Sequence, residues 1–454
     1  MKTKFFAGTA MCLIGTTALA GGLFTNTNQN PIFFRQPAQN ANIGVQGSYY
    51  NPAGLALMND GLHFSIGYQM AIQERTSTST YAPFAYNADR PGQQTVKFEG
   101  KAFSPVIPSL DLSYNKNKWA ASFHFGFLSG GGSCKYDNGL GSFESKLSLP
   151  ILMSGGALEA YKADINFKGK TFGMAGQFNY SYRLIDKADM KLAVAAGLRL
   201  NYLINDYAGG IYNWKLKATG GQFYKAAEVP VYGMTLKDDM EVYCYQTGFG
   251  INPILSAHYS IGKFDIAARY EFRTALTLTN ETDINTAGLA QFDDGVKSRS
   301  DIPALLAAGL NYRIMPTFRA SVGYHLFFDK QANFSNDRQD KLGANTWEGL
   351  AGLEWDACNK LTLSLGTQFT VCDFGPNNEY NSDMAQSFNS WCLAGGLRYL
   401  ISDRMALDFS VFNTFFDSNT REYSDYSGAG ANIPGSDEFM RSNLNFGLGL
   451  TYNF

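Results

Sequence analysis

The strongest constraint in this sequence is a period-two alternation of apolar and polar residues. In segment 62–72 every second residue is apolar, and the residues between are mostly small or polar; the apolar positions are Leu62, Phe64, Ile66, Tyr68, Met70 and Ile72. Successive side chains of a β-strand point to opposite faces of its sheet, so this pattern predicts a strand with one apolar and one polar face. The alternation recurs in segments 119–128 and 264–272.

Applied along the whole chain, this rule predicts fourteen strands. They fall near residues 61–72, 106–115, 118–128, 170–184, 190–203, 244–261, 263–274, 302–314, 317–329, 345–356, 360–371, 388–401, 403–416 and 441–454. Short turns, such as Gly262-Lys263 and Met315-Pro316, alternate with long connections, which span 73–105, 129–169, 204–243 and 275–301. We therefore expect one end of the sheet to carry tight turns and the other to carry long loops.

The alternation fits either a soluble sandwich or a transmembrane barrel. In a sandwich the apolar faces pack against a second sheet. Here the polar faces are rich in Gly, Ser, Asn and charge, and the apolar faces carry large aromatics near the strand ends. Strands that cross lipid must close into a barrel, because an open edge would leave backbone groups unpaired. We predict an all-β fold, a 14-stranded antiparallel transmembrane β-barrel over residues 61–454.

The first twenty residues have the layout of a secretory signal. Lys2 and Lys4 precede an apolar stretch, which ends in the small-residue sequence Ala18-Leu19-Ala20. That stretch is shorter than the roughly 20 residues of a membrane-spanning helix, so we predict a signal peptide over 1–20, cleaved after Ala20. With the predicted barrel, it places the protein in the outer membrane of a Gram-negative bacterium.

Charge and cysteine content exclude several functions. The chain has 37 Lys and Arg against 39 Asp and Glu, without a basic run, so it lacks the electrostatic footprint of a nucleic-acid binder. The mature cysteines are scattered and form no C-x-x-C pair, which indicates neither a zinc site nor a dense disulfide framework. Their odd number leaves at least one thiol free, and a single bridge stays possible; they are Cys134, Cys244, Cys358, Cys372 and Cys392.

No motif indicates an enzyme or a cofactor. The chain has no His-Glu-x-x-His and no nucleophile elbow. All four histidines point to the lumen by phase, without metal-ligand spacing; they are His63, His124, His258 and His325. Five arginines also face inward by phase, where each could pair with a lumen acid, with a hatch group or with a ligand carboxylate; they are Arg183, Arg199, Arg269, Arg273 and Arg319.

The final strand alternates up to a terminal Phe454. Such an end resembles the recognition signal of bacterial outer-membrane barrels, which implies insertion by the barrel assembly machinery. The alternative is a strand that happens to end on an aromatic residue in phase.

Residues 21–60 do not alternate, and they end in Asn51-Pro52-Ala53-Gly54 just before the first strand. This stretch resembles the Asn-Pro-Ala motif of the FadL family, outer-membrane transporters of long-chain fatty acids and other hydrophobic compounds. The strand count agrees, as does the region from Ile107 to Leu110. The resemblance spans essentially the mature chain, although its specific motif is three or four residues long. Taken alone, those four residues also suit an ordinary turn.

The resemblance implies that residues 21–60 form a hatch that plugs the lumen. In that family, ligand is thought to be captured by an apolar groove in the third and fourth extracellular loops, to pass to a second apolar site inside, and to leave sideways through a gap at an inward kink of strand three. Glycines near the upper end of that strand are candidates for the kink, the alternative being a flexible loop start; they are Gly126, Gly130, Gly131 and Gly132.

An apolar run in the predicted second loop is the candidate ligand surface, because exposed apolar surface in a loop requires an explanation. Its apolar members are Leu147, Leu149, Ile151, Leu152 and Met153. Packing over the barrel mouth is the alternative, since the family groove lies on other loops. We expect passive, ligand-triggered diffusion of hydrophobic molecules, most simply long-chain fatty acids, from the outside into outer-membrane lipid. The competing functions are a general porin for small hydrophilic solutes and a structural or adhesive barrel.

Overall fold

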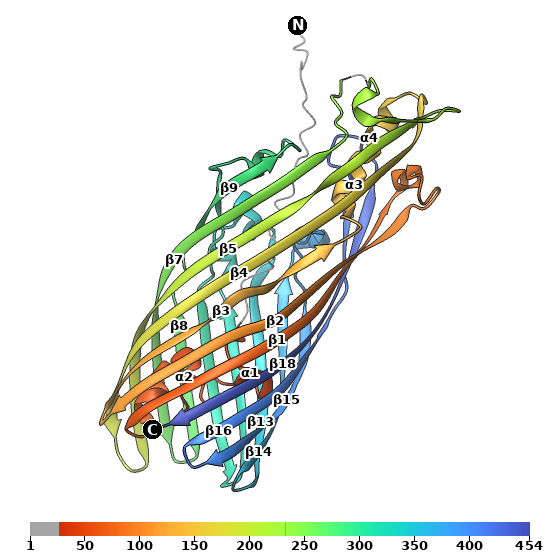
Figure 1. Ribbon diagram of the computed structural model, residues 1–454. Coiled ribbons are helices and arrows are strands. Elements are labelled where there is room, and N and C mark those ends of the chain that lie inside the picture. The colour runs from red at the N-terminus through yellow and green to blue at the C-terminus, as the bar shows by residue number, and fades with distance from the viewer. Residues whose placement is uncertain (1–26, 232) are drawn as a thin grey trace.

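The computed structural model describes residues 27–231 and 233–454. Its strands form one antiparallel sheet, in which β1 (Gly61–Tyr81) pairs with β2 (Thr95–Lys116) on one side and with β18 (Gly435–Asn453) on the other. The sheet therefore closes into the predicted barrel of fourteen strands (Figure 1). The signal peptide predicted for residues 1–20 and the first residues of the predicted hatch lie outside the described residues.

Each predicted strand corresponds to one strand of the wall. The other wall strands are β3 (Trp119–Tyr136), β4 (Leu158–Asp186), β5 (Met190–Ala218), β7 (Met240–Ile261), β8 (Phe264–Glu271), β11 (Leu305–Met315), β12 (Phe318–Phe327), β13 (Ala344–Cys358), β14 (Leu361–Asp373), β15 (Ser390–Ser402) and β16 (Met405–Phe416). Four short strands add to the sheet beyond the ends of their neighbours: β6 (Phe223–Lys225), β9 (Thr277–Asn285), β10 (Lys297–Arg299) and β17 (Asn419–Tyr423).

The outer face of the wall is an apolar band. On β1 the outward side chains of Leu62, Ile66, Tyr68 and Ile72 are all exposed. Beyond Ile72 the outward residues become polar, beginning with Glu74. The apolar band is the surface that faces lipid in a transmembrane barrel, so the polar continuation of β1 lies outside the membrane.

The prediction that 73–105, 129–169, 204–243 and 275–301 are loops was wrong for much of their length. β4 and β5 each contain 29 residues, which at about 3.3 Å per residue span roughly 95 Å. A membrane needs only about 10 residues of a tilted strand. The strand extensions beyond the membrane have water on the outside, so their outward residues are polar and their apolar residues face inward. On β4, for example, Tyr161 and Phe167 are buried inside, whereas Lys162 and Lys168 are exposed. Backbone pairing with their neighbours continues regardless.

The N-terminal segment, residues 27–60, lies inside the lumen near the end with the tight turns, and we call it the hatch. It contains α1 (Pro31–Arg35), α2 (Gly47–Tyr50) and the 3-10 helix η1 (Pro52–Leu57). Figure 1 shows α1 and α2 within the barrel, at the same end as the C-terminus. Most hatch residues are buried. None of the helices within the described ranges is long and apolar enough to cross a membrane.

The opposite end, which we call the loop end, carries the long loops and several short helices, many of whose residues pack inward. These are α3 (Gly141–Leu147), α4 (Leu149–Met153) and the 3-10 helices η2 (Ala82–Tyr86), η3 (Ala226–Glu228), η4 (Ala290–Phe292), η5 (Asp329–Gln331), η6 (Ser335–Lys341) and η7 (Pro376–Asn378). The five cysteines of the described residues are all free thiols, so none of them forms the bridge that their number left open.

Candidate functional site

The Asn51-Pro52-Ala53-Gly54 motif joins the hatch to the barrel wall. The Asn51 side chain is fully buried; its Oδ1 accepts from the Gly54 backbone N–H at 3.2 Å, which caps η1, and its Nδ2 lies 2.8 Å from Nδ1 of His258 on β7. The Pro52 carbonyl accepts from the Ser181 hydroxyl on β4 at 2.6 Å. The same four residues therefore make a turn and bind two strands of the wall.

Arg35 fixes the other end of the hatch through buried charges. Its guanidinium lies 2.9 Å from Glu354 and 3.3 Å from Asp408, and it donates to the Ser364 hydroxyl at 3.0 Å. Its side chain is 3% exposed. A buried guanidinium is tolerated only where carboxylates and hydrogen bonds compensate for its lost hydration, so this position of α1 is specific.

A second charged contact surrounds the hatch residue Tyr49. The guanidinium carbons of Arg199 and Arg269 lie 4.8 and 4.6 Å from the centre of its ring. Arg269 donates to the Tyr49 carbonyl, and both arginines pair with the buried Glu271. The two arginines, held in place by the Glu271 carboxylate, therefore bind Tyr49 and with it α2 to the wall.

Buried histidines and acids complete the hatch contacts. His124 lies 2.8 Å from Asp111, which also accepts from the hatch residues Asn30 and Ser48 at 2.7 and 2.5 Å. His325 lies 3.0 Å from the hatch residue Asn40. All four histidines point inward as predicted, but all are buried and contact hatch residues rather than open water; His63, for example, lies 2.9 Å from the Asn59 carbonyl. No group of three or more His, Cys, Asp or Glu suited to a metal ion occurs in the part of the chain that the structure describes.

Each of the five arginines predicted to face inward has a protein partner. Their acidic partners include Asp186, Glu271, Asp301, Glu354 and Asp356, and the paired arginines are Arg183, Arg199, Arg269, Arg273 and Arg319. Arg183, Arg199 and Arg269 also contact hatch residues, whereas Arg273 and Arg319 pair with acids of the loops and the wall. A ligand carboxylate would have to displace an acid to reach any of the five.

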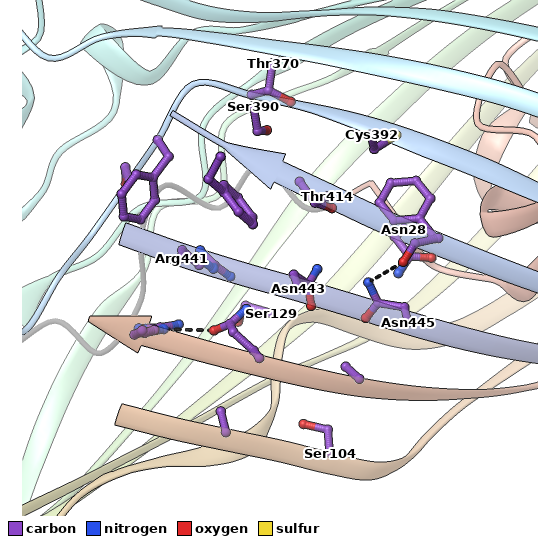
Figure 2. Close-up of a pocket in the computed structure, with 18 of the residues that line it drawn as sticks. Asn28, Ser104, Ser129, Thr370, Ser390, Cys392, Thr414, Arg441, Asn443 and Asn445 are labelled. Atoms are coloured by element: carbon purple, nitrogen blue, oxygen red, sulfur yellow. Dashed lines mark hydrogen bonds between the residues drawn. The ribbon is translucent and has the colours of Figure 1, made fainter. Parts of the chain in front are cut away.

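A chamber of about 350 Å³ lies in the lumen above the hatch. Its floor is apolar: the rings of Phe33 and Phe34 on α1 pack against Phe412 of β16 at 5.8 and 5.1 Å between centroids. Higher in the wall the lining is mainly hydroxyl and amide groups; Figure 2 shows Thr370, Ser390, Thr414, Asn443 and Asn445. The chamber is therefore amphipathic, with its apolar part at the hatch.

The wall beside this chamber is interrupted between β2 and β3. Their register runs from Lys116 opposite Trp119 to Leu110 opposite Phe125, and resumes at Phe103 opposite Ser133. Residues 104–109 of β2 and 126–132 of β3 have no partner across this seam. Four residues from these unpaired segments line the chamber: Ser104, Ile107, Leu128 and Ser129.

Two prolines give the interruption a local cause. Pro105 and Pro108 lie in the unpaired part of β2, and proline has no N–H to donate to a ladder. The Tyr68 hydroxyl donates to the Pro105 carbonyl at 2.6 Å, which provides a side-chain substitute for strand pairing. The prolines were the sequence signal for this break, which glycine content alone did not reveal.

The four candidate glycines lie on the β3 side of the same interruption. The register with β4 shifts between Phe127 and Ser129 and again between Gly130 and Gly132, so Gly131 is a bulged position. A Cβ added at Gly126 would meet Oε1 of the hatch residue Gln29 at 2.7 Å. The Gln29 amide also donates to the Phe127 carbonyl at 2.9 Å. The hatch therefore approaches the wall where β2 and β3 separate.

The candidate ligand surface at 147–153 is mostly packed. Leu147, Leu149 and Ile151 are buried, and Leu147 and Ile151 belong to a cluster with Trp214 and Tyr161. Leu152 is half-buried, and Met153 is exposed. This supports packing over the barrel mouth for the three buried residues, whose side chains leave little surface for a ligand.

A different apolar pocket of about 40 Å³ lies next to α3 at the loop end. Its aromatic walls are Phe143, Phe167, Tyr207 and Phe292, which come from α3, β4, β5 and η4. Met240 and Val242 of β7 also line it, as do Leu289 and Ala287 from the connection between β9 and β10. Five separate chain segments build this pocket, so no local pattern in the sequence indicates it.

The segment between β14 and β15 lines the chamber on the side of the loop end. Its residues 380–388 are all buried, and Gln386, Ser387 and Phe388 line the chamber. Asp383 accepts from the Ser142 backbone N–H at the start of α3 at 2.9 Å. Burial and the nearby Asp383 carboxylate raise the pKa of Asp437, in the extension of β18 beyond the membrane, to about 7.

Comparisons with known proteins identify the fold. No family model and no curated protein matches the sequence. Among solved structures, a Pseudomonas aeruginosa FadL homologue is 12% identical with a TM-score of 0.61, and the match covers 94% of this chain and 98% of that one. The Ralstonia pickettii toluene transporter TbuX is 14% identical, with a TM-score of 0.55 and coverage of 95% and 100%.

A third solved structure is the Pseudomonas putida toluene transporter TodX, which is 13% identical with a TM-score of 0.54 and coverage of 95% and 100%. Because the sequence identities are this low, the similarity concerns the backbone fold alone. This chain therefore has the FadL-type fold, a fourteen-stranded barrel with its N-terminal segment inside.

Proposed function

We propose that this protein carries hydrophobic molecules, most simply long-chain fatty acids, through the bacterial outer membrane by passive diffusion. The observation that carries the proposal is the interrupted pairing between β2 and β3, because residues of both unpaired segments line the chamber. A break in the ladder at that place provides a route from the chamber into the surrounding lipid. The solved structures with this fold include toluene transporters, which supports a hydrophobic ligand.

The proposed route begins at the loop end, which faces outside the cell. Ligand enters through the aromatic pocket of Phe143, Phe167, Tyr207 and Phe292 and passes into the chamber. It then leaves between β2 and β3, while the hatch stays in place. The buried ion pairs of Arg35 support a hatch that stays in place, because its movement would separate Arg35 from Glu354 and Asp408 and leave these charges buried without partners.

Free energy favours a lateral exit for an apolar solute. Each methylene group kept out of water is worth about 0.8 kcal/mol, so release of a long alkyl chain into the periplasm would cost far more than its transfer into lipid. A hydrophilic solute has no such preference, and the hatch obstructs its direct path. The same geometry thus discriminates between the two kinds of solute.

The remaining elements of the proposal concern biogenesis. A signal peptide over residues 1–20 would direct export, and Phe454 would be recognised by the barrel assembly machinery. Phe454 is exposed beside Phe64 on the outer face, where a partner can reach it.

Uptake in cells tests the function. Cells with and without this protein would be given labelled palmitate, labelled toluene and a labelled small sugar. We expect protein-dependent uptake of at least one apolar solute and none of the sugar. Sugar uptake without apolar uptake would support a hydrophilic porin instead, and no dependence for any of the three would support a structural or adhesive barrel.

A further inference from the structure

Four lysines gather on three adjacent strands of the wall. Lys101 of β2 lies directly opposite Lys135 of β3, and Lys135 lies directly opposite Lys168 of β4. Lys170 is two residues farther along β4 and therefore shares the face of Lys168. We call these four residues the lysine patch; Figure 1 shows the three strands side by side.

The lysine patch is on the outer face of the barrel. The residues next to these lysines on each strand line the chamber inside: Ala102, Cys134 and Gly169. Because successive side chains of a strand point to opposite faces, the lysines point outward. Lys101, Lys135 and Lys168 are exposed. Lys170 is half-buried, and its ammonium group lies 4.6 Å from the centre of the Phe172 ring.

The patch begins where the lipid-facing apolar band ends. The next outward residue towards the membrane is Phe103 on β2, which is 56% exposed, and Phe172 on β4. From these two residues to the tight turns, the outward residues of both strands are mainly apolar. The band faces the acyl chains of a membrane, so the lysines lie at the level of the lipid head groups.

The protein neutralises little of this positive charge. Lys135 lies 2.7 Å from the exposed Asp137, and the other three lysines make no ion pair with any residue that the structure describes. Like charges directly opposite each other in an antiparallel pair destabilise the sheet. Two such contacts occur in succession here, from Lys101 to Lys135 and from Lys135 to Lys168. An anion bound between neighbouring lysines would remove this repulsion.

Acidic residues mark the two sides of the patch. Glu74 of β1 is opposite Lys101, and Asp206 of β5 is opposite Lys170. The concentration of positive charge is thus confined to β2, β3 and β4. Neighbouring strands are about 4.8 Å apart, so three lysines in line extend over about 10 Å. That length allows contact with more than one phosphate group.

We infer that the lysine patch binds the phosphate groups of an anionic lipid in the outer leaflet of the membrane, whose acyl chains lie on the apolar band. A lysine ammonium binds phosphate as a compact point charge, and basic residues at a membrane surface attract anionic head groups. Continuity with the apolar band favours a lipid over a soluble anion, because a lipid contacts the lysines and Phe103 together. The inference goes beyond the proposed function and shares with it only the outward orientation of the loop end.

Lipid binding to the purified barrel in a nonionic detergent tests the inference, measured by native mass spectrometry during a titration. The probes are lipid A, an acylated disaccharide with phosphate groups, and phosphatidylethanolamine, which has no net charge. Each lysine at a membrane surface contributes about fivefold to the affinity for an anionic lipid. The combined variant Lys101→Gln, Lys135→Gln and Lys168→Gln should therefore bind lipid A about a hundredfold more weakly. Its binding of phosphatidylethanolamine should stay within about twofold.

A second combined variant controls for the loss of three positive charges. Lys116→Gln, Lys118→Gln and Lys187→Gln remove exposed lysines from the tight turns that connect β2 with β3 and β4 with β5. This variant should bind lipid A within about twofold of the unaltered protein. Heat-modifiable migration would verify that both barrels are folded. Equal weakening in the two folded variants would show a general attraction to positive charge and overturn the inference.

Three further outcomes would also overturn it. The first is unchanged lipid A binding in the folded patch variant, and the second is phosphatidylethanolamine binding as tight as that of lipid A. The third is displacement of lipid A by inorganic phosphate at an equal concentration of phosphate groups, which would show a site for free anions. Palmitate uptake by cells measures the proposed function separately, so each of these outcomes would leave hydrophobic transport standing.

Discussion

Replacement of Arg35 by Met should release the hatch from the wall while the barrel stays folded. The change removes two buried carboxylate contacts and one hydrogen bond, to Glu354, Asp408 and Ser364. Removal of one partner from a buried ion pair costs about 3 to 5 kcal/mol. Both acids keep other arginines, at 2.8 Å in each case, so we expect the lower end, about 3 kcal/mol. That is roughly a hundredfold in the ratio of docked to undocked hatch.

Ion conductance in planar bilayers measures this ratio, because a displaced hatch leaves a path for small ions. Arg35→Met should show openings about a hundredfold more often than the unaltered protein. Arg319→Met is the matched control: it removes a partner of the same Glu354 but lies on β12 and leaves the hatch contacts intact. Equal conductance of the two variants, with both barrels folded, would refute the assignment of Arg35 as a hatch anchor.

Three further predictions concern the motif, the loop end and the entry pocket. Asn51→Ala should weaken the docking of η1 by about 2 kcal/mol, because the buried Gly54 N–H and the His258 ring each lose a hydrogen-bond partner. Limited proteolysis should then cleave the hatch faster. The pKa of the Asp437 carboxyl is raised from its ordinary value of 3.8 to about 7. Its protonated form therefore stabilises the packed loops at low pH, and a rise in pH from about 4 to 7 should destabilise them. Hydrogen exchange at the loop end should become faster over this pH range in the unaltered protein, and Asp437→Asn should remove that pH dependence. Phe292→Asp should slow palmitate uptake at low but not at saturating concentration, and equal slowing at both would contradict capture at this pocket.

The sequence predicted the wall well because lipid imposes a pattern on it. Leu62 to Ile72 alternate since one face meets lipid and the other meets the lumen, and every predicted strand is present. The pattern stops at Gln73 although β1 continues to Tyr81, because outside the membrane both faces tolerate polar residues. On β4 an alternation continues beyond the membrane with its apolar face turned inward, as at Tyr161 and Phe167. A rule that follows apolar residues on the lipid-facing side therefore ends each strand too early.

The functional site was harder to predict from the sequence, because its residues come together through contacts between distant parts of the chain. The Asn51 motif could be found because its residues are adjacent, whereas its partners on β4 and β7 could not. The lysine patch forms only because β2, β3 and β4 pair in one register, and inward phase alone pointed to arginines that prove to be paired with acids. Pro105 and Pro108 were visible in the sequence, and proline in a predicted strand should have indicated a broken ladder there.

The central claim is that ligand leaves the chamber sideways between β2 and β3, and closing this seam tests it most directly. The register changes by one residue across the interruption, so Pro105→Val and Pro108→Val combined with deletion of the bulged Gly131 would allow continuous pairing. Palmitate uptake would be measured per folded barrel at the cell surface, with heat-modifiable migration as the measure of folding. The account predicts that uptake falls to the level of cells without the protein. Undiminished uptake by the folded variant would contradict exit through the wall.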